Sequence, residues 1–212
     1  MGVNSIMERG YHRRDVTRDE AWALLCEHTK GESLRKHGLA VEAAMRRLAR
    51  SSGGDEEEWA ITGLLHDFDY EGDPAGHPQN GKGMLEQAGV PGNIVHAIQT
   101  HGDHLGIPRI APIEKSLYAV DELTGFVTAV ALVRPSKRVA DVDPQSVRKK
   151  MKDKAFARAI DRDMMLKGAE ALGVPFDDLV AEVVLALRGI APELGLDGIA
   201  PREEGGERSP AS

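Results

Sequence analysis

A histidine and an aspartate stand next to each other where an apolar run ends, at His66 and Asp67. Imidazole nitrogens and carboxylate oxygens are ligands that divalent transition metals accept in proteins. Further histidines occur on both sides of this doublet, at His37, His77, His96, His101 and His104. The doublet therefore predicts the centre of a metal site, and other parts of the chain are expected to supply the remaining ligands.

Four potential ligands lie in strongly apolar surroundings: His37, His66, Asp67 and Asp121. Taken singly, His37 has an alternative as a hydrogen-bonded core histidine, and Asp121 as part of an exposed helix face. Taken together they favour one site, because buried polar groups are costly and one divalent ion would satisfy all of them. The absence of cysteine from the set indicates Mn, Fe, Zn, Co or Ni rather than a structural thiolate zinc. Such a set leaves positions open for water, as metal-assisted hydrolysis requires.

Helices are the elements that would position these ligands. Apolar residues recur at helical spacing, and the chain contains no useful period-2 strand pattern and no internal repeat. Thr17 and Glu20 have the spacing of a capping box, and Asp55 precedes three glutamates that complement a helix dipole. The expected helices cover residues 18–29, 32–51, 55 to the doublet, 79–88, 92–101, 113–133, 161–172 and 176–189. The pattern predicts an all-α fold in which the doublet ends a central helix.

The downstream histidines are expected in different settings. His77 precedes Pro78, so it is predicted to cap the helix that Pro78 opens. His101 continues the apolar face formed by Ile94 and Ile98, whereas His96 lies off that face and is expected to be exposed.

The bulk composition of the 212-residue chain indicates one domain, residues 17–193, between a mobile segment 1–16 and a disordered tail 194–212. The net charge of −7 argues against strong nucleic-acid binding. No signal peptide and no membrane-spanning run is recognised, and Cys26 is the single cysteine, so we expect a cytoplasmic location. The region 134–158 carries nine basic residues against three aspartates, either as a solvated face or as an electrostatic lip for an anionic substrate.

The order His37, His66-Asp67 and Asp121 resembles that of the HD-domain metal-dependent phosphohydrolases. The resemblance covers roughly residues 30–132 and implies an all-α helical bundle, here with extra C-terminal helices. It also implies that these residues are the metal ligands. The stretch His77-Pro78-Gln79-Asn80-Gly81 is similar to a motif of binuclear HD-GYP-like members. That similarity implies a second ion held by His77 and His101, with Asp67 as a bridge.

The resemblance implies hydrolysis of a phosphate ester on a phosphorylated small molecule or nucleotide, with one or two divalent ions. Asp67 is expected to orient the nucleophile, and Lys82 to hold the phosphate, although Lys82 has an alternative as a solvated residue. Two other functions remain open: a non-catalytic HD-like module that binds a nucleotide or a partner, and a di-iron oxygenase. Oligomeric state is left open by the sequence.

Overall fold

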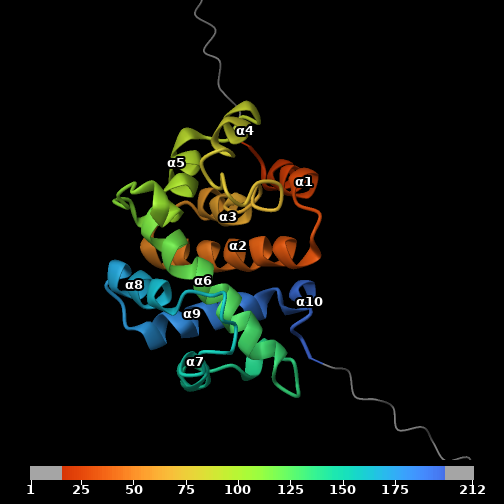
Figure 1. Cartoon of the computed structure of the whole chain (residues 1–212), viewed down its shortest axis with the longest axis vertical. Helices are drawn as coiled ribbons and strands as arrows, with labels where there is room; N and C mark the ends of the chain where they lie inside the picture. Colours follow the sequence, from red (N-terminus) through yellow and green to blue (C-terminus); the bar gives the residue numbers. More distant parts are fainter. Residues whose placement is uncertain (1–15, 199–212) are drawn as a thin grey trace, which may run out of the picture. The chain divides into compact units, whose positions relative to one another are not determined.

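The computed structural model describes residues 16–198, and the regular elements of this part of the chain are helices joined by turns and loops (Figure 1). In chain order the elements are α1 (Arg18–His28), α2 (Glu32–Ser52), α3 (Glu56–Leu65), α4 (Lys82–Gln87), α5 (Gly92–His101), the short 3-10 helix η1 (Asp103–Leu105), α6 (Pro112–Leu132), the 3-10 helix η2 (Val139–Asp141), α7 (Pro144–Met151), α8 (Arg162–Leu172), α9 (Phe176–Gly189) and α10 (Ala191–Leu194). Within the described range, β-type pairing is confined to one isolated bridge between Arg138 and Asp197. The all-α prediction is confirmed. Among the described helices, none combines the length and the apolar character needed to cross a membrane.

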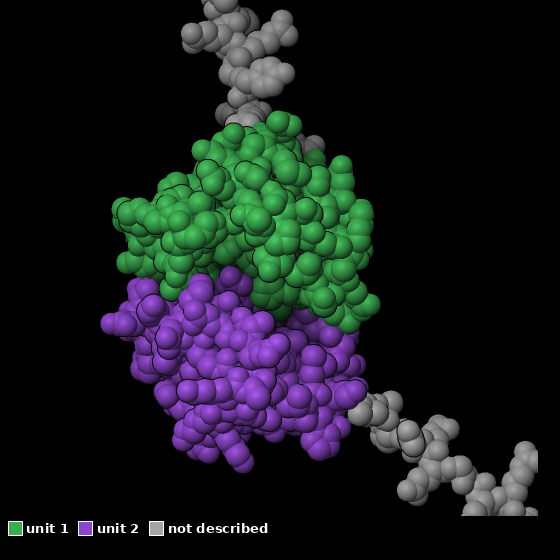
Figure 2. All heavy atoms as spheres, viewed as in Figure 1, with its two compact units in different colours: residues 1–118 green, residues 119–212 purple. Residues whose placement is uncertain are grey.

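The chain divides into two compact units, residues 1–118 and 119–212, which Figure 2 colours separately. The first unit contains α1 to α5, η1 and the first turns of α6. The second contains the rest of α6 together with η2 and α7 to α10. The boundary, between Tyr118 and Ala119, falls inside the continuous helix α6.

The predicted terminal segments fall mostly outside the described residues, because residues 1–15 and 199–212 are not among them. Of the segment expected to be a disordered tail, residues 194–198 are described. Leu194 ends α10, and Leu196 has no exposed surface.

The first unit is built around α3, which is buried on nearly every side. Every residue from Trp59 to Leu65 is buried. Helix α2 packs along α3, and α1 and α5 contact it as well. Asp55 starts the helix by accepting hydrogen bonds at 2.9 Å from the backbone amides of Glu57 and Glu58. The first backbone amides of α3 therefore have hydrogen-bond acceptors at the surface, and the apolar residues that follow are buried up to His66.

Gly63 lets α2 and α3 approach closely. A Cβ atom at this position would lie 2.8 Å from the carbonyl oxygen of Val41 and 2.9 Å from the amide nitrogen of Glu42. Because backbone atoms cannot yield as a flexible side chain can, we expect Gly63→Ala to destabilise the protein by about 1–3 kcal/mol. Urea unfolding measures this change. Gly83→Ala at an exposed position of α4 is the control, because a Cβ there meets nothing within 4 Å. Equal midpoints for the two variants would contradict the expected clash.

Most predicted helices coincide closely with observed ones. The expected segments 92–101 and 176–189 have the same limits as α5 and α9, and 113–133 is displaced by one residue from α6. Helix α7 was not predicted, because it lies in the basic region, where the apolar pattern is weak.

The helix predicted over residues 79–88 is present, but its predicted start and its cap at His77 are wrong. Helix α4 begins only at Lys82, with Gly81 at its cap position. The preceding residues form consecutive turns in which Asp73 accepts hydrogen bonds from Gly76 N at 3.0 Å and from Asn80 Nδ2 at 2.8 Å. Such side-chain bonds offer the chain an alternative to helix, and the loop around His77 is therefore longer than the sequence pattern indicated.

In the second unit, α7, α8, α10 and η2 contact α9. Two basic side chains of residues 134–158 contact other residues of the second unit. The Arg148 guanidinium lies 5.2 Å from the ring centroid of Phe176 and pairs with Asp177 at 2.5 Å. Lys150 Nζ lies 4.7 Å from the ring centroid of Phe156. These two side chains are therefore packed against the unit, and the expected role of the region as an anion lip stays a prediction.

Candidate metal centre

The His66-Asp67 doublet lies where α3 ends and a tight turn begins. His66 still has helical backbone angles (φ −56°, ψ −37°), and Phe68 N donates a hydrogen bond to Leu65 O at 3.2 Å. Phe68 is fully buried, and its carbonyl oxygen accepts a hydrogen bond from Thr29 Oγ1 at 2.9 Å. The turn is thus attached to the core of the first unit on both sides of Asp67, which restricts where its carboxylate can point.

The two carboxylate oxygens of Asp67 face different pairs of histidines. Oδ2 lies 3.4 Å from His66 Nε2 and 3.8 Å from His37 Nε2. Oδ1 lies 3.0 Å from His77 Nε2 and 3.6 Å from His101 Nε2. One side chain therefore stands between two imidazole pairs, and it presents one oxygen to each.

The second pair is brought together by contacts between the loop after the doublet and α5. Gln99 on α5 is buried, and its Nε2 donates a hydrogen bond to Pro78 O at 2.6 Å. Since Pro78 follows His77 and His101 ends α5, this bond holds the two histidines near each other. Their Nε2 atoms are 3.1 Å apart.

In three of the four histidines, Nδ1 faces an oxygen acceptor: His66 faces Gly63 O at 2.8 Å, His101 faces Ile98 O at 2.5 Å and His77 faces Asp69 Oδ1 at 2.6 Å. An oxygen acceptor at this distance assigns a proton to Nδ1. The other ring nitrogen, Nε2, is then the one directed toward Asp67. This is the tautomer that a histidine needs in order to bind a metal through Nε2.

The electrostatics of the second pair favour a cation. Burial by itself would lower the pKa of His77, but hydrogen bonds with Asp67 and Asp69 outweigh it and raise the pKa to about 9. Burial likewise opposes the charge of Asp67, whereas His66, then His101 and His77, hold the pKa of its carboxyl well below the usual range. A proton on His77 satisfies these contacts in the metal-free protein. Metal binding would displace that proton, as it does at protein metal sites in general.

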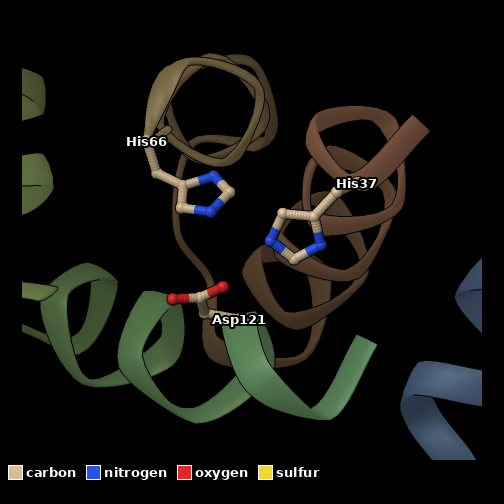
Figure 3. A group of neighbouring side chains, drawn as sticks. All are labelled: His37, His66 and Asp121. Atoms are coloured by element: carbon tan, nitrogen blue, oxygen red, sulfur yellow. The ribbon is translucent and has the colours of Figure 1, made fainter. Parts of the chain in front are cut away.

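Figure 3 shows the other group, His37 on α2, His66 at the end of α3 and Asp121 on α6. Each offers a ligand atom within 4.8 Å of the others, and the same holds for Asp67, His77 and His101. The rings of His37 and His66 meet edge to face, with centroids 5.0 Å apart. Asp121 follows the unit boundary by three residues, on the same helix whose first turns belong to the first unit. The structure therefore gathers all six predicted ligands into two groups of three.

The residues present fit divalent ions. Ligand atoms that bind one ion at about 2.1 Å lie about 3.0–3.5 Å from each other in octahedral or tetrahedral sites. Asp67 Oδ1, His77 Nε2 and His101 Nε2 are separated by 3.0, 3.1 and 3.6 Å. A donor set of imidazole and carboxylate, without thiolate, suits Mn, Fe, Co, Ni or Zn.

Other candidate residues lie outside these groups. Lys82 is exposed at the start of α4, and its Nζ lies 3.9 Å from Glu86 Oε1. Its contact with a phosphate stays a prediction. His96 Nδ1 instead contacts Glu114 Oε1 at 2.9 Å, and the His96 side chain is about half exposed, as expected. The sequence reasoning missed Asp69, which contacts His77. The sequence feature that could have indicated it is a second aspartate, directly after the apolar Phe68 and two residues after Asp67.

These observations define an all-helical protein with paired His/Asp groups suited to divalent cations. The HD-domain family model matches residues 34–141, which is just over half of the chain, and the protein therefore belongs to the HD-domain family. Members of this family bind divalent metals and are of the metal-dependent phosphohydrolase type. Neither a curated protein nor a solved structure gives a match.

Proposed function

We propose that the protein is a two-ion phosphohydrolase that cleaves a phosphomonoester or phosphodiester of a small molecule, with nucleotides among the candidate substrates. The observation that carries the proposal is the division of the Asp67 carboxylate between His37 and His66 on one side and His77 and His101 on the other. A carboxylate placed in this way is suited to bridge two cations, and paired cations are used by many phosphatases and nucleases.

In this proposal, His37, His66 and Asp121 hold one ion, and His77 and His101 hold the other, with Asp67 shared. When bound, the ions supply a hydroxide nucleophile near neutral pH and positive charge for the phosphoryl oxygens. The motif His77-Pro78-Gln79-Asn80-Gly81, similar to that of binuclear HD-GYP-like members, supports a second ion.

The chain's own groups position the centre and leave one side open. The His66, His77 and His101 side chains are at least nine-tenths buried, whereas about a fifth of each of the His37 and Asp67 side chains is exposed. The buried rings are fixed by their Nδ1 acceptors, so little reorganisation is needed when a substrate arrives. A phosphate would reach the centre on the side of His37 and Asp67. We propose that Lys82 contributes a positive charge to phosphate binding.

The proposal is tested with purified protein reconstituted separately with Mn²⁺, Fe²⁺, Co²⁺, Ni²⁺ and Zn²⁺. We expect hydrolysis of p-nitrophenyl phosphate or bis-p-nitrophenyl phosphate with at least one ion, and a nucleotide panel then narrows the substrate. Oxygen uptake is recorded in parallel. Bound metal without turnover on either ester or the nucleotides would favour a binding module, and iron-specific oxygen consumption would favour an oxygenase; either outcome would overturn the hydrolase proposal.

A further inference from the structure

Asp69 lies directly behind His77 and is buried, with about 7% of the residue exposed. Its Oδ1 accepts a hydrogen bond from His77 Nδ1 at 2.6 Å, on the side of the ring opposite to Asp67. We infer that Asp69 is a positioning residue for the second ion: its carboxylate fixes the tautomer and the orientation of His77. This inference rests on the proposed two-ion centre. Asp69 belongs to neither of the two groups of candidate metal ligands.

The other oxygen of Asp69, Oδ2, shows that His77 is the main hydrogen-bond partner of this carboxylate. Among the described residues, Oδ2 has no hydrogen-bond partner, although it is buried. Asp69 also lines a cavity of about 200 Å³ whose other lining residues include His28, Asp73 and Met84. Within the described structure, the hydrogen bonding of the carboxylate is therefore directed at His77. A carboxylate hydrogen-bonded to the far nitrogen of a ligating histidine raises the basicity of that ligand.

Gly81 provides the space that Asp69 occupies. A Cβ atom at Gly81 would lie 2.4 Å from Asp69 Oδ2, 2.7 Å from Asp69 Cγ and 2.9 Å from the ring of Phe68. Because Phe68 is fully buried, the ring cannot easily move aside. The glycine that ends the His77–Gly81 motif is thus required by the approach of Asp69, and a side chain there would displace the carboxylate from His77.

Three variants distinguish the effects of the charge of Asp69, of its hydrogen bond to His77 and of the space that Gly81 leaves for it. Asp69→Asn keeps an oxygen that accepts from Nδ1 but loses the charge, so the affinity for the ion at His77 and His101 should fall about 10-fold. Asp69→Ala also loses the acceptor, and Gly81→Ala displaces the carboxylate, so each should lower that affinity about 100-fold. Asp73→Asn is the matched control, because Asp73 borders the same cavity and its hydrogen bonds go to Gly76 and Asn80.

The measurement is the number of ions bound per chain, titrated with Mn²⁺ and with Zn²⁺ into metal-free protein, together with the thermal midpoint of each variant. A second readout is the exchange-protected Nδ1–H proton of His77 in the metal-free protein, identified by its loss in His77→Gln. We expect this signal to disappear in Asp69→Ala and Gly81→Ala and to persist in Asp73→Asn.

The results separate this inference from the proposed function. Two ions bound by the wild type and with the same affinities by Asp69→Ala would overturn the inference and leave the two-ion centre intact. An equal loss of affinity in Asp73→Asn would also overturn it, because the effect would then belong to the loop. Failure of the wild type to bind either ion would remove the proposed function itself, and the inference with it.

Discussion

Replacing Asp67 by alanine is expected to abolish measurable phosphoesterase activity and to lower metal binding at both groups. The reason is that one carboxylate faces all four histidines, with Oδ2 toward His37 and His66 and Oδ1 toward His77 and His101. Losing the shared ligand removes the charge that both ions need, and several kcal/mol of transition-state stabilisation corresponds to a fall in kcat/KM of about 10³-fold or more. Steady-state assays and metal analysis of the same preparation measure both effects.

Two comparisons make this result specific to Asp67. Asp19→Ala removes an exposed aspartate from the first turn of α1 and should leave kcat/KM and metal content unchanged. His77→Ala should lose the second ion and retain the first. If Asp67→Ala kept two ions while His77→Ala lost one, the assignment of Asp67 as the shared ligand would be wrong.

Removing the metal is expected to destabilise the protein as well as inactivate it. The metal-free centre holds Asp67 among four imidazoles, and the pKa of His77 is raised to about 9 because the surroundings favour positive charge there. An ion present at one hundred times its Kd should add about 2.7 kcal/mol per site, and each kcal/mol corresponds to roughly 2–4 °C in a domain of this size. We therefore expect chelation to lower the thermal midpoint by several degrees and readdition to restore it.

Calorimetry with and without a chelator measures the shift, and elemental analysis gives the number of ions per chain. The size of the shift should grow with the free ion concentration, as linkage requires. In the Asp67→Ala variant the shift should shrink strongly, which separates binding at this centre from weak binding elsewhere. A midpoint that is the same in holo and chelated wild type would contradict a stabilising ion at this centre.

Much of the helical framework could be predicted from the sequence, because it depends on local interactions. The capping box of Thr17 and Glu20 is present as expected, with Glu20 N donating to Thr17 Oγ1 at 3.3 Å. Asp55 caps α3, and α5 covers the residues that the apolar spacing of Ile94 and Ile98 indicated. Caps and periodicity are properties of neighbouring residues, so these elements need no knowledge of the rest of the chain.

The start of the helix predicted over residues 79–88 was wrong because it depends on more than local interactions. The proline rule favoured a helix beginning at Pro78, yet Asp73 accepts hydrogen bonds from Gly76 and Asn80, and Gln99 on α5 donates to Pro78 O. The contact from Gln99 comes from a helix well removed along the chain. The local preference for helix is outweighed at these residues, because these hydrogen bonds stabilise a loop instead.

The same distinction applies to the candidate site. Residue types and their apolar surroundings selected His37, His66, Asp67 and Asp121 as candidate ligands, and the resemblance to binuclear HD-GYP-like members added His77 and His101. Which oxygen of Asp67 faces which pair of histidines, and the presence of Asp69 behind His77, were decided by the tertiary structure alone. Ligand chemistry is carried by each residue, but orientation depends on how α2, α3, α5 and the intervening turns pack, and close approaches such as Gly81 under Asp69 exist only after that packing.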